Sequence, residues 1–487
     1  MINGIKYKWM IVALCVAITM AIVSTLFRPL WRDEYWALFF SDPDLNLNKL
    51  VSDRLVRDVH PPLYFYTIYK IRQLIDDTLL LRFLNLLWLA TAGFAAWRLS
   101  SRPSRHLALF LFACFTSYWA IFFTAEVRPY AALYGLTIML TVLTAELSLR
   151  EGYTPGRLAV FALCGAAAGM LHYFAALFTA FCGLVMGLSW LARRRFGRFV
   201  LIGAVSVIAI TPAALWIIFS FDQMTISGDS DEGALMRLEY GLEQLLRGIL
   251  VKTFGSNLAL TALAVAGASA AWRLQDRRAV VLVFAVVGAI CVVFALHLAW
   301  APLIKERAFI VFMPALIWLM VEAASRAPSG RVTKFLAAAI PIAAMFSPLL
   351  FVGEYLKDRE RFSEVRAVYE RYPSCQNASI YAYFRSYQHE DYYPYFTRMA
   401  LTGGVPSPGL ELVEAGLQNG AQIRPEEACP IAGVAIGLRR GDEALRDLAR
   451  AAMLESGLDL SAMEERRLAT GRHLIFLRDE GKLGELS

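Results

Sequence analysis

The sequence predicts a polytopic α-helical membrane protein with a C-terminal soluble α/β domain. Apolar residues make up 57% of the 487 residues, and charged residues only 18%. A typical soluble chain has about 25% charged residues and too little interior to bury such an excess of apolar side chains. The apolar residues also gather in runs of about 18 or more, which is long enough for a helix to cross a bilayer. These observations exclude a disordered chain, a small disulfide scaffold and an ordinary cytosolic enzyme.

About eleven membrane-spanning helices are expected within residues 1–352, which we take as the membrane domain. The first follows Lys6 and Lys8 and lacks a small-residue cleavage site, so it is expected to be an uncleaved anchor. The expected spans are 9–27, 79–98, 107–124, 130–149, 158–171, 173–191, 199–219, 255–272, 279–298, 307–323 and 335–352.

Positive charge alternates with these spans. The connections at one face hold 17 Lys and Arg and two acids, Glu151 and Asp276. Because Lys and Arg accumulate in cytoplasmic loops, this face is expected to be cytoplasmic. The net charge of +7 is therefore a topology signal, and no continuous basic stripe indicates a nucleic-acid partner. The opposite face receives the loop 28–78 and the segment 221–250, which is expected to form a lid or, alternatively, an ordinary polar connection.

The tail, residues 353–487, is expected to be a soluble extracytoplasmic domain. Helical patterns at 354–372 and 441–457 alternate with short β-like runs at 378–384, 430–437 and 473–478. Cys375 and Cys429 are the only cysteines of this tail. An oxidising compartment favours a disulfide between them, although their spacing alone does not give the geometry of a bond.

Ionisable residues gather at the expected outer face. Asp33 and Glu34 follow the first span, and Asp58 and His60 precede Pro61-Pro62. One of two adjacent carboxylates in a partly desolvated setting can act as a base while the other orients a partner. A solvated loop pair is the alternative.

Three more groups stand at expected outer turns. They are Glu126 with Arg128, His172, and Lys305 with Arg307. Inserting an ionisable residue at membrane depth costs about 2.5–3.5 kcal/mol, so such residues tend to be paired or functional. The alternatives are an internal Glu126–Arg128 pair, a structurally bonded histidine and interfacial anchors. Together the cations suit a phosphate, and a carboxylate suits deprotonation of an attacking hydroxyl. Since no nucleotide-binding motif is present, the phosphate is expected on a lipid.

These motifs resemble those of the GT-C glycosyltransferases, in particular the protein O-mannosyltransferase and lipid A aminoarabinose transferase group. Asp33-Glu34 resembles the acidic pair of that group, and residues 58–63, DVHPPL, closely resemble its D-x-H-P-P-L motif. Residues 126–130, EVRPY, and 172–174, HYF, resemble elements of bacterial relatives. The resemblance covers roughly residues 1–350, whereas the tail matches no motif of the group.

The resemblance implies transfer of a hexosyl or pentosyl group from a polyprenyl-phosphate donor to lipid A, another glycolipid, a glycan or a protein. It implies that Asp33 is the general base and that Glu34 orients it or the acceptor. The donor-phosphate or substrate-binding residues would be Asp58, His60, Glu126, Arg128, His172, Lys305 and Arg307. A lipid or solute transporter and a GT-C-like glycan ligase or polymerase are the alternative functions.

The expected cofactor and compartment follow from single positions and from composition. The aminoarabinose enzymes place a Lys that contacts the carrier phosphate at the position of His60, and a Glu at the position of Val59. No metal ligand is therefore assigned and no cofactor is required, although a divalent metal stays open. Arg outnumbers Lys and no retention signal is present, which favours a bacterial cytoplasmic (inner) membrane.

Overall fold

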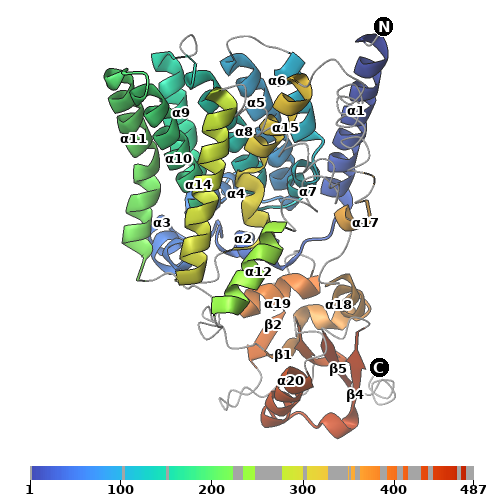
Figure 1. Cartoon of the computed structure of the whole chain (residues 1–487). Coiled ribbons are helices and arrows are strands. Elements are labelled where there is room, and N and C mark those ends of the chain that lie inside the picture. The colour runs from blue at the N-terminus through green and yellow to red at the C-terminus, as the bar shows by residue number, and fades with distance from the viewer. Residues whose placement is uncertain are drawn as a thin grey trace. The chain divides into compact units, whose positions relative to one another are not determined.

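Figure 1 shows the computed structural model of the chain, in which two compact units are formed by different stretches of sequence. Residues 1–28 and 40–356 form a helical unit, and residues 29–39 and 357–487 form a smaller α/β unit. The structure describes residues 3–100, 105–149, 153–222, 234–246, 277–299, 304–326, 349, 352–356, 362–383, 392–402, 410–414, 429–436, 443–468 and 473–478.

Long apolar helices make up most of the helical unit. Among the described residues, six helices are long and apolar enough to cross a membrane. They are α1 (Asn3–Phe27), α5 (Thr78–Leu99), α8 (Tyr130–Leu147), α10 (Tyr173–Leu191), α11 (Phe196–Ser220) and α14 (Arg277–Ala299). The helices α6 (Arg105–Phe115) and α7 (Tyr118–Thr124) form one further apolar stretch that is bent by 49°. The chain is thus a multi-pass membrane protein.

The remaining four expected spans do not correspond to long helices among the described residues. Two of them correspond to shorter helices, α9 (Pro155–Gly169) and α15 (Met313–Arg326), the latter preceded by the 3-10 helix η4 (Glu306–Val311). The expected span 255–272 lies outside the described residues, and of the expected span 335–352 only residues 349 and 352 are described. By length and composition, the described part of the chain therefore accounts for six or seven of the expected eleven spans.

Side-chain caps fix where several of these helices begin. Asp77 accepts hydrogen bonds from the backbone nitrogens of Leu79 and Leu80 and so caps α5. Thr154 caps α9, which has a proline in its first turn, and the ring of His172 caps α10. These side chains satisfy backbone donors that have no partner within the helix.

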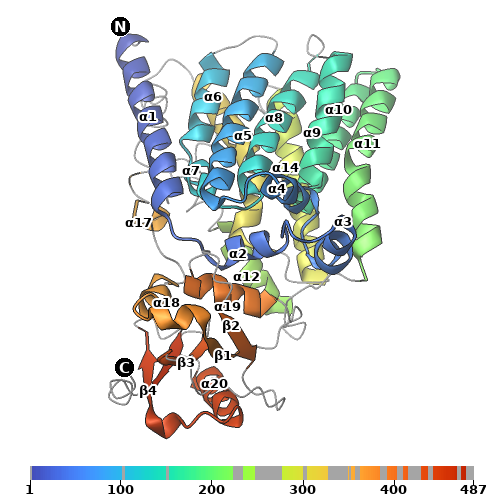
Figure 2. The same ribbon diagram turned by 180° about the vertical axis from the view of Figure 1, so that it is seen from behind.

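The helix α10 packs between α11, α9 and α14 in the interior of the helical unit. Glycine permits the closest approach, because a Cβ on Gly183 would collide with the side chain of Ser206 on α11. Membrane helices associate through such small residues, since lipid and side chains are equally apolar. In both views α1 and α11 lie at opposite edges of the bundle (Figures 1 and 2).

Short elements connect the long helices. The segment after residue 46 forms α3 (Leu47–Lys49), a π-helical turn η1 (Leu50–Arg54), a 3-10 turn η2 (Leu55–Arg57) and α4 (Leu63–Arg72). Two further short helices are α12 (Ala234–Leu246) and α17 (Val352–Tyr355). Both α3 and α12 lie at the end of the bundle opposite the start of α1 (Figures 1 and 2).

The α/β unit contains a five-stranded sheet with strand order β2-β1-β3-β5-β4. The strands are β1 (Ser379–Tyr383), β2 (Glu411–Glu414), β3 (Ile431–Ala435), β4 (Met463–Arg467) and β5 (Leu474–Arg478). Strand β1 runs parallel to β2 and β3, whereas β5 runs antiparallel to β3 and β4. The runs at 378–384, 430–437 and 473–478 thus contain strands, and β2 and β4 were not anticipated.

Helices cover both faces of this sheet. On one face, α20 (Glu443–Glu455) contributes Ala449 and Met453 to an apolar core that includes Leu474 and Phe476 of β5. On the other face lie α18 (Phe362–Tyr369) and α19 (Tyr392–Thr402) (Figure 2). The alternation of strand side chains between two faces explains why neighbouring residues of β5 serve both layers. The predicted fold class, a helical membrane protein with a C-terminal α/β part, is confirmed.

The helix α2 (Arg32–Phe39) belongs to the α/β unit, although its sequence lies just after the first span. The ring of Tyr35 lies 5.8 Å from Phe362 and 5.9 Å from Phe396, measured between centroids. The ring of Phe39 lies 5.5 Å from that of Tyr395. Aromatic packing therefore groups α2 with α18 and α19.

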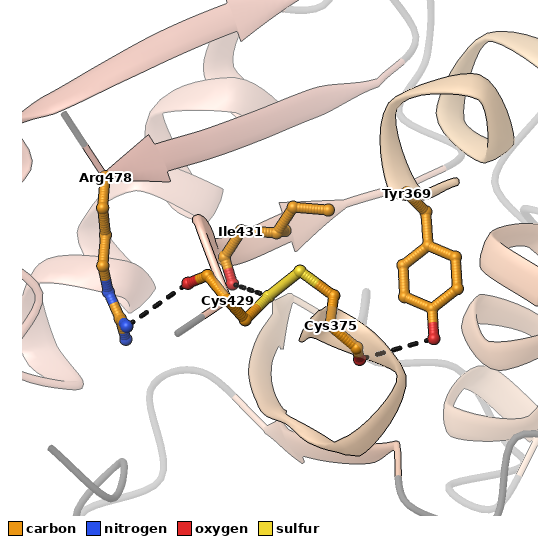
Figure 3. Close-up of a disulfide and its surroundings, with 5 residues drawn as sticks. All are labelled: Tyr369, Cys375, Cys429, Ile431 and Arg478. Carbon is orange, nitrogen blue, oxygen red and sulfur yellow. Dashed lines mark hydrogen bonds between the residues drawn. A yellow bond between two sulfur atoms is a disulfide. The ribbon is translucent and has the colours of Figure 1, made fainter. Parts of the chain in front are cut away.

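A disulfide joins Cys375 and Cys429 in the α/β unit, with their Cα atoms 4.6 Å apart. Cys375 lies in the 3-10 helix η5 (Pro373–Asn377), and Cys429 precedes β3. Figure 3 shows that the carbonyl groups of both cysteines accept hydrogen bonds, from Tyr369 Oη and Arg478 Nη1 respectively, each at 3.4 Å. The bond links the segment before β1 to the start of the central strand.

Candidate active site

The centre of the candidate site is a pair formed by Asp58 and His60. Asp58 follows η2 in an extended conformation, and its Oδ1 accepts a hydrogen bond from the backbone nitrogen of His60 at 2.6 Å. The same oxygen lies 2.7 Å from Nδ1 of the His60 ring. The Asp58 side chain is 1% exposed and that of His60 17%, so the pair lies at the edge of the interior. One carboxylate oxygen therefore fixes both the main chain and the ring of His60.

His172 lies beside this pair. Its ring centroid is 5.9 Å from that of His60, with 76° between the ring planes. A backbone bond helps to join the two segments, because Leu63 N, the first residue of α4, donates to Met170 O at 3.2 Å. Since Pro61 and Pro62 restrict the backbone between His60 and Leu63, this bond limits where the His60 ring can lie.

Two guanidinium groups share one aromatic ring in the same unit. Cζ of Arg128 lies 5.7 Å from the Tyr130 ring centroid, and Cζ of Arg307 lies 5.8 Å from it. Arg128 and Tyr130 are buried, Arg307 is half-buried, and Lys305 is exposed. The negative face of an aromatic ring attracts cations, so the Tyr130 ring helps to bring these two positive charges into one region.

His60, His172, Arg128 and Arg307 influence one another electrostatically. Burial lowers the pKa of His60 below its ordinary value even though Asp58 raises it, and Arg128 and Arg307 lower it further. Burial likewise lowers the pKa of His172, and His60, Arg307 and Arg128 add to this effect. Both imidazoles are therefore neutral at pH 7, and the positive charge of the cluster lies on the two arginines.

The hydrogen bonds fix which nitrogen of each neutral ring carries the proton. A carboxylate only accepts, so Nδ1 of His60 donates to Asp58 and the lone pair lies on Nε2. Nδ1 of His172 accepts from the backbone nitrogen of Phe174 at 3.2 Å, so its proton lies on Nε2. The cluster thus offers one acceptor nitrogen, one N–H donor and two guanidinium groups. The guanidinium groups and the N–H donor suit the oxygens of a phosphate. The acceptor nitrogen of His60 can take up a proton.

Glu126 is paired with Arg28, which is not among the predicted site residues. Its Oε1 lies 2.7 Å from Nη2 of Arg28, and both side chains are fully buried. The Arg28 guanidinium also lies 4.2 Å from the Phe122 ring centroid, and Asn85 Nδ2 donates to the Glu126 carbonyl at 2.6 Å. The sequence signals were a charge directly after the first span and a polar Asn85 within an apolar one. This ion pair fixes the turn from which Arg128 projects.

Asp33 and Glu34 lie in the first turn of α2, in the α/β unit, whereas the His60 cluster lies in the helical unit. Glu34 is buried and Asp33 is half-buried. Negative charge in the first turn of a helix is favoured by the backbone dipoles. Within the helical unit, the structure brings together five of the predicted site residues, which are Asp58, His60, Arg128, His172 and Arg307.

A metal centre is not evident in the described part of the chain. No group of three or more His, Cys, Asp or Glu side chains among these residues could hold a metal ion. Within the described part of the helical unit, the charged groups that act on His60 are the carboxylate of Asp58 and the guanidinium groups of Arg128 and Arg307, which repel cations. This set fits an anion better than a divalent metal.

The fold defines the class of protein to which these features belong. No family model matches the chain, and no curated protein matches it in sequence. Among solved structures, ArnT from Cupriavidus metallidurans in the apo state is similar, with a TM-score of 0.53 at 13% identity over 97% of this chain and 98% of ArnT. ArnT bound to undecaprenyl phosphate gives a TM-score of 0.52 at 13% identity over 96% and 98%.

A third similar structure is the Archaeoglobus fulgidus oligosaccharyltransferase in complex with Zn and sulfate. Its TM-score is 0.48 at 12% identity over 97% of this chain and 73% of that one. The similarity to ArnT extends over almost the whole of both chains. The protein therefore has the GT-C fold, and the resemblance found in its motifs is confirmed at the level of the fold.

Proposed function

We propose that this protein transfers a sugar from a polyprenyl-phosphate donor to an acceptor hydroxyl. The observation that carries the proposal is the position of Arg128 and Arg307 on one Tyr130 ring, beside two neutral histidines. ArnT, which shares the fold, has been crystallised with undecaprenyl phosphate. Two guanidinium groups and the Nε2–H of His172 supply donors for the phosphate oxygens, as anion recognition requires.

In the proposed reaction, the acceptor oxygen attacks the anomeric carbon of the sugar. The bond between that carbon and the phosphate oxygen breaks, and polyprenyl phosphate leaves with both electrons. Asp33 takes the proton of the acceptor hydroxyl, and Glu34 orients the base or the acceptor. Arg128 and Arg307 stabilise the negative charge that develops on the leaving phosphate. The first stretch of the helical unit ends at Arg28. Asp33 lies five residues further along the sequence.

The proposal extends to the other expected partners. The acceptor is a lipid such as lipid A, another glycolipid, a glycan or a protein, and the donor sugar is a hexose or a pentose. The site faces the extracytoplasmic side of a bacterial inner membrane, as the distribution of Lys and Arg favours. Residues 353–487 form a separate extracytoplasmic domain.

The direct test is a transfer assay with a radiolabelled polyprenyl-phosphate sugar, the purified full-length protein in vesicles, and a membrane extract as the acceptor source. Label on an acceptor supports glycosyl transfer, whereas label that only crosses the bilayer supports the alternative of a transporter. Label that appears only in glycan chains of several sugars supports a ligase or polymerase.

Variants separate the two halves of the proposed site. Asp33→Asn removes the base and is expected to abolish transfer while the protein remains folded. Asp44→Asn is the matched control, because Asp44 is an exposed carboxylate of the same loop. Full activity of Asp33→Asn would refute the role of Asp33 as base and leave the phosphate site untouched.

The phosphate site is tested by donor affinity. Arg128→Ala, Arg307→Ala and His60→Ala are expected to weaken donor binding, each arginine by roughly ten- to a hundred-fold, the usual effect of losing a charge-assisted hydrogen bond. Arg57→Ala is the control, since Arg57 is an exposed cation next to Asp58. Unchanged donor affinity in all three variants would remove the phosphate-site proposal.

A further inference from the structure

The helix α12 is joined to the segment that carries Arg307 by a side chain with no assigned role. Oε1 of Gln244 accepts a hydrogen bond from the backbone nitrogen of Glu306 at 3.0 Å. Glu306 is the first residue of η4 and the immediate neighbour of Arg307. The backbone that presents the Arg307 guanidinium to the Tyr130 ring is therefore anchored on a different element.

A second side chain, from α14, holds the same segment. Nδ1 of His297, which is fully buried near the end of α14, lies 3.4 Å from the backbone nitrogen of Ile304 and accepts its hydrogen bond. Gln244 and His297 thus fix backbone nitrogens one and three positions before Arg307. The N-cap residue of η4, Lys305, makes no side-chain cap bond, and Gln244 satisfies the first backbone donor of this 3-10 helix instead, while His297 holds the residue before the N-cap.

The two anchors are also packed against each other through a glycine. A Cβ on Gly241 of α12 would lie 3.0 Å from both Cδ2 and Nε2 of His297, and 3.2 Å from the ring of Phe294. The ring of Tyr240 stacks near His297, with centroids 6.4 Å apart. A side chain at position 241 would crowd α14, and the close approach of α12 to α14 brings Gln244 within hydrogen-bond distance of Glu306 N.

The face of α12 turned away from these contacts is apolar. Leu238, Leu242 and Leu246 recur every four residues and are 37%, 44% and 52% exposed. Residues with this spacing lie on one side of a helix. The anchoring contacts come from Gly241 and Gln244, so α12 is held to α14 and η4 by a small set of specific contacts.

We propose that Gln244 and His297 are positioning residues that hold Arg307 in place for the donor phosphate, and that seating of α12 on His297 through Gly241 is coupled to phosphate binding. The proposal rests on the proposed phosphate site. When α12 is seated, the Glu306 and Ile304 amides are held and Arg307 remains at the Tyr130 ring. When α12 leaves, the η4 backbone loses one anchor and the guanidinium loses its fixed position. Binding of a phosphate to Arg307 therefore favours the seated helix, since coupling between two sites is reciprocal.

The first experiment measures the backbone and needs no ligand. Hydrogen exchange of the full-length protein is followed by mass spectrometry on peptides that cover residues 304–311. Gln244→Leu, which keeps the size of the side chain and removes the acceptor, is expected to speed exchange there. Glu239→Gln, an exposed polar change on the same helix, is the control. Unchanged exchange in Gln244→Leu would overturn the positioning role whatever the protein binds.

The second experiment measures affinity for undecaprenyl phosphate in a double-mutant cycle. Gln244→Leu is expected to weaken binding roughly three- to ten-fold in the wild-type background, as loss of one hydrogen bond does. In an Arg307→Ala background the same change is expected to have no further effect, because the group that it positions is gone. An equal loss in both backgrounds would show that Gln244 acts independently of Arg307 and would overturn the proposal.

The cycle separates this inference from the proposed function. If Arg307→Ala leaves undecaprenyl phosphate affinity unchanged, the phosphate site itself is wrong. If Arg307→Ala weakens binding and Gln244→Leu does not, the site stands and the positioning role is wrong. Gly241→Ala gives an independent check through packing, and is expected to lower affinity and raise exchange at residues 304–311 together.

Discussion

Asp58 Oδ1 accepts hydrogen bonds from both the backbone nitrogen and the ring Nδ1 of His60, at 2.6 and 2.7 Å. This relationship sets the tautomer of the neutral ring and places a lone pair on Nε2. A carboxylate–imidazole pair of this kind can give or take a proton at Nε2 while its orientation is held. His60 lies beside His172, and two arginines lower its pKa, so we expect its charge to respond if an anion binds here.

Binding of undecaprenyl phosphate is expected to depend on pH through His60. The pKa of His60 is lowered in the protein, and a nearby phosphate raises it because an anion stabilises the imidazolium. Affinity is therefore expected to increase as the pH falls from 7.5 to 5.5. Isothermal titration calorimetry of wild type and His60→Gln gives the comparison, since titration of the phosphate itself is common to both.

The same experiment with Asp58→Asn tests the pair. Asp58 is the group that raises the pKa of His60, so its neutralisation lowers that pKa further. The pH range in which affinity rises is then expected to move to lower pH. If wild type and His60→Gln show the same pH dependence, His60 does not face the phosphate.

Stability is expected to fall in acid because His172 is held neutral. Its pKa in the folded protein is lowered below the ordinary value of about 6.5, so below that pH the unfolded chain binds a proton that the folded chain does not. This contribution is fully present above pH 6.5 and is lost as the pH falls towards the folded pKa, by at most about 1.4 kcal/mol per pH unit.

His172→Asn is the matched variant for this prediction. Asparagine can still accept the hydrogen bond from Phe174 N at the start of α10, but it does not titrate. Apparent melting temperatures in detergent between pH 7.5 and 5 are expected to fall less steeply in the variant. Parallel curves for the two proteins would contradict the assignment.

Removing one partner of the Arg28–Glu126 ion pair is expected to be costly. Both side chains are fully buried, so Glu126→Ala leaves a buried guanidinium without its counter-charge, a loss of about 3–5 kcal/mol in stability. The double variant Arg28→Met, Glu126→Leu is expected to be more stable than Glu126→Ala alone, since neither charge of the pair is then left buried without its partner. Thermal denaturation checks both. A loss of donor affinity in Glu126→Gln at unchanged stability would instead indicate a substrate-binding role.

The close approach of α10 and α11 makes a specific prediction for glycines. Gly183→Ala is expected to lower the melting temperature, because the new Cβ would collide with Ser206. Gly203→Ala on α11 is the control, since nothing lies within 4 Å of a Cβ at that position. Combining Gly183→Ala with Ser206→Gly is expected to restore much of the loss. Equal effects of the two alanines would show that the interface is not close-packed.

The Cys375–Cys429 disulfide closes a loop with a sequence separation of 54. Restricting a loop of this length in the unfolded chain stabilises a fold by about 4 kcal/mol in the chain-entropy account. Cys375→Ser with Cys429→Ser is therefore expected to destabilise the α/β unit. Alkylation and mass spectrometry of the native protein, with and without reductant, should show two additional thiols after reduction. Alkylation of Cys375 and Cys429 before reduction would contradict both the disulfide and the oxidising compartment.

Local sequence was sufficient to place most elements of the fold. Apolar runs of about 18 residues or more predicted the long helices, because any helix that crosses a bilayer must present apolar side chains all round. The strands β1, β3 and β5 lie in three apolar β-like runs. Strand β4 (Met463–Arg467) was not anticipated, since its charged sequence, MEERR, carries no apolar alternation and depends on pairing with β5.

The candidate site likewise combines features that the sequence determined with features that only the tertiary structure decided. The sequence by itself determined which ionisable residues stand at turns between apolar segments, including Asp58, His60 and Arg128, because charge is excluded from the spans. Only the tertiary structure decided that Glu126 pairs with Arg28 and that Arg307 shares the Tyr130 ring with Arg128. Such partners come from segments far apart in the chain, and packing of the helices selects among several charges that the sequence leaves equivalent.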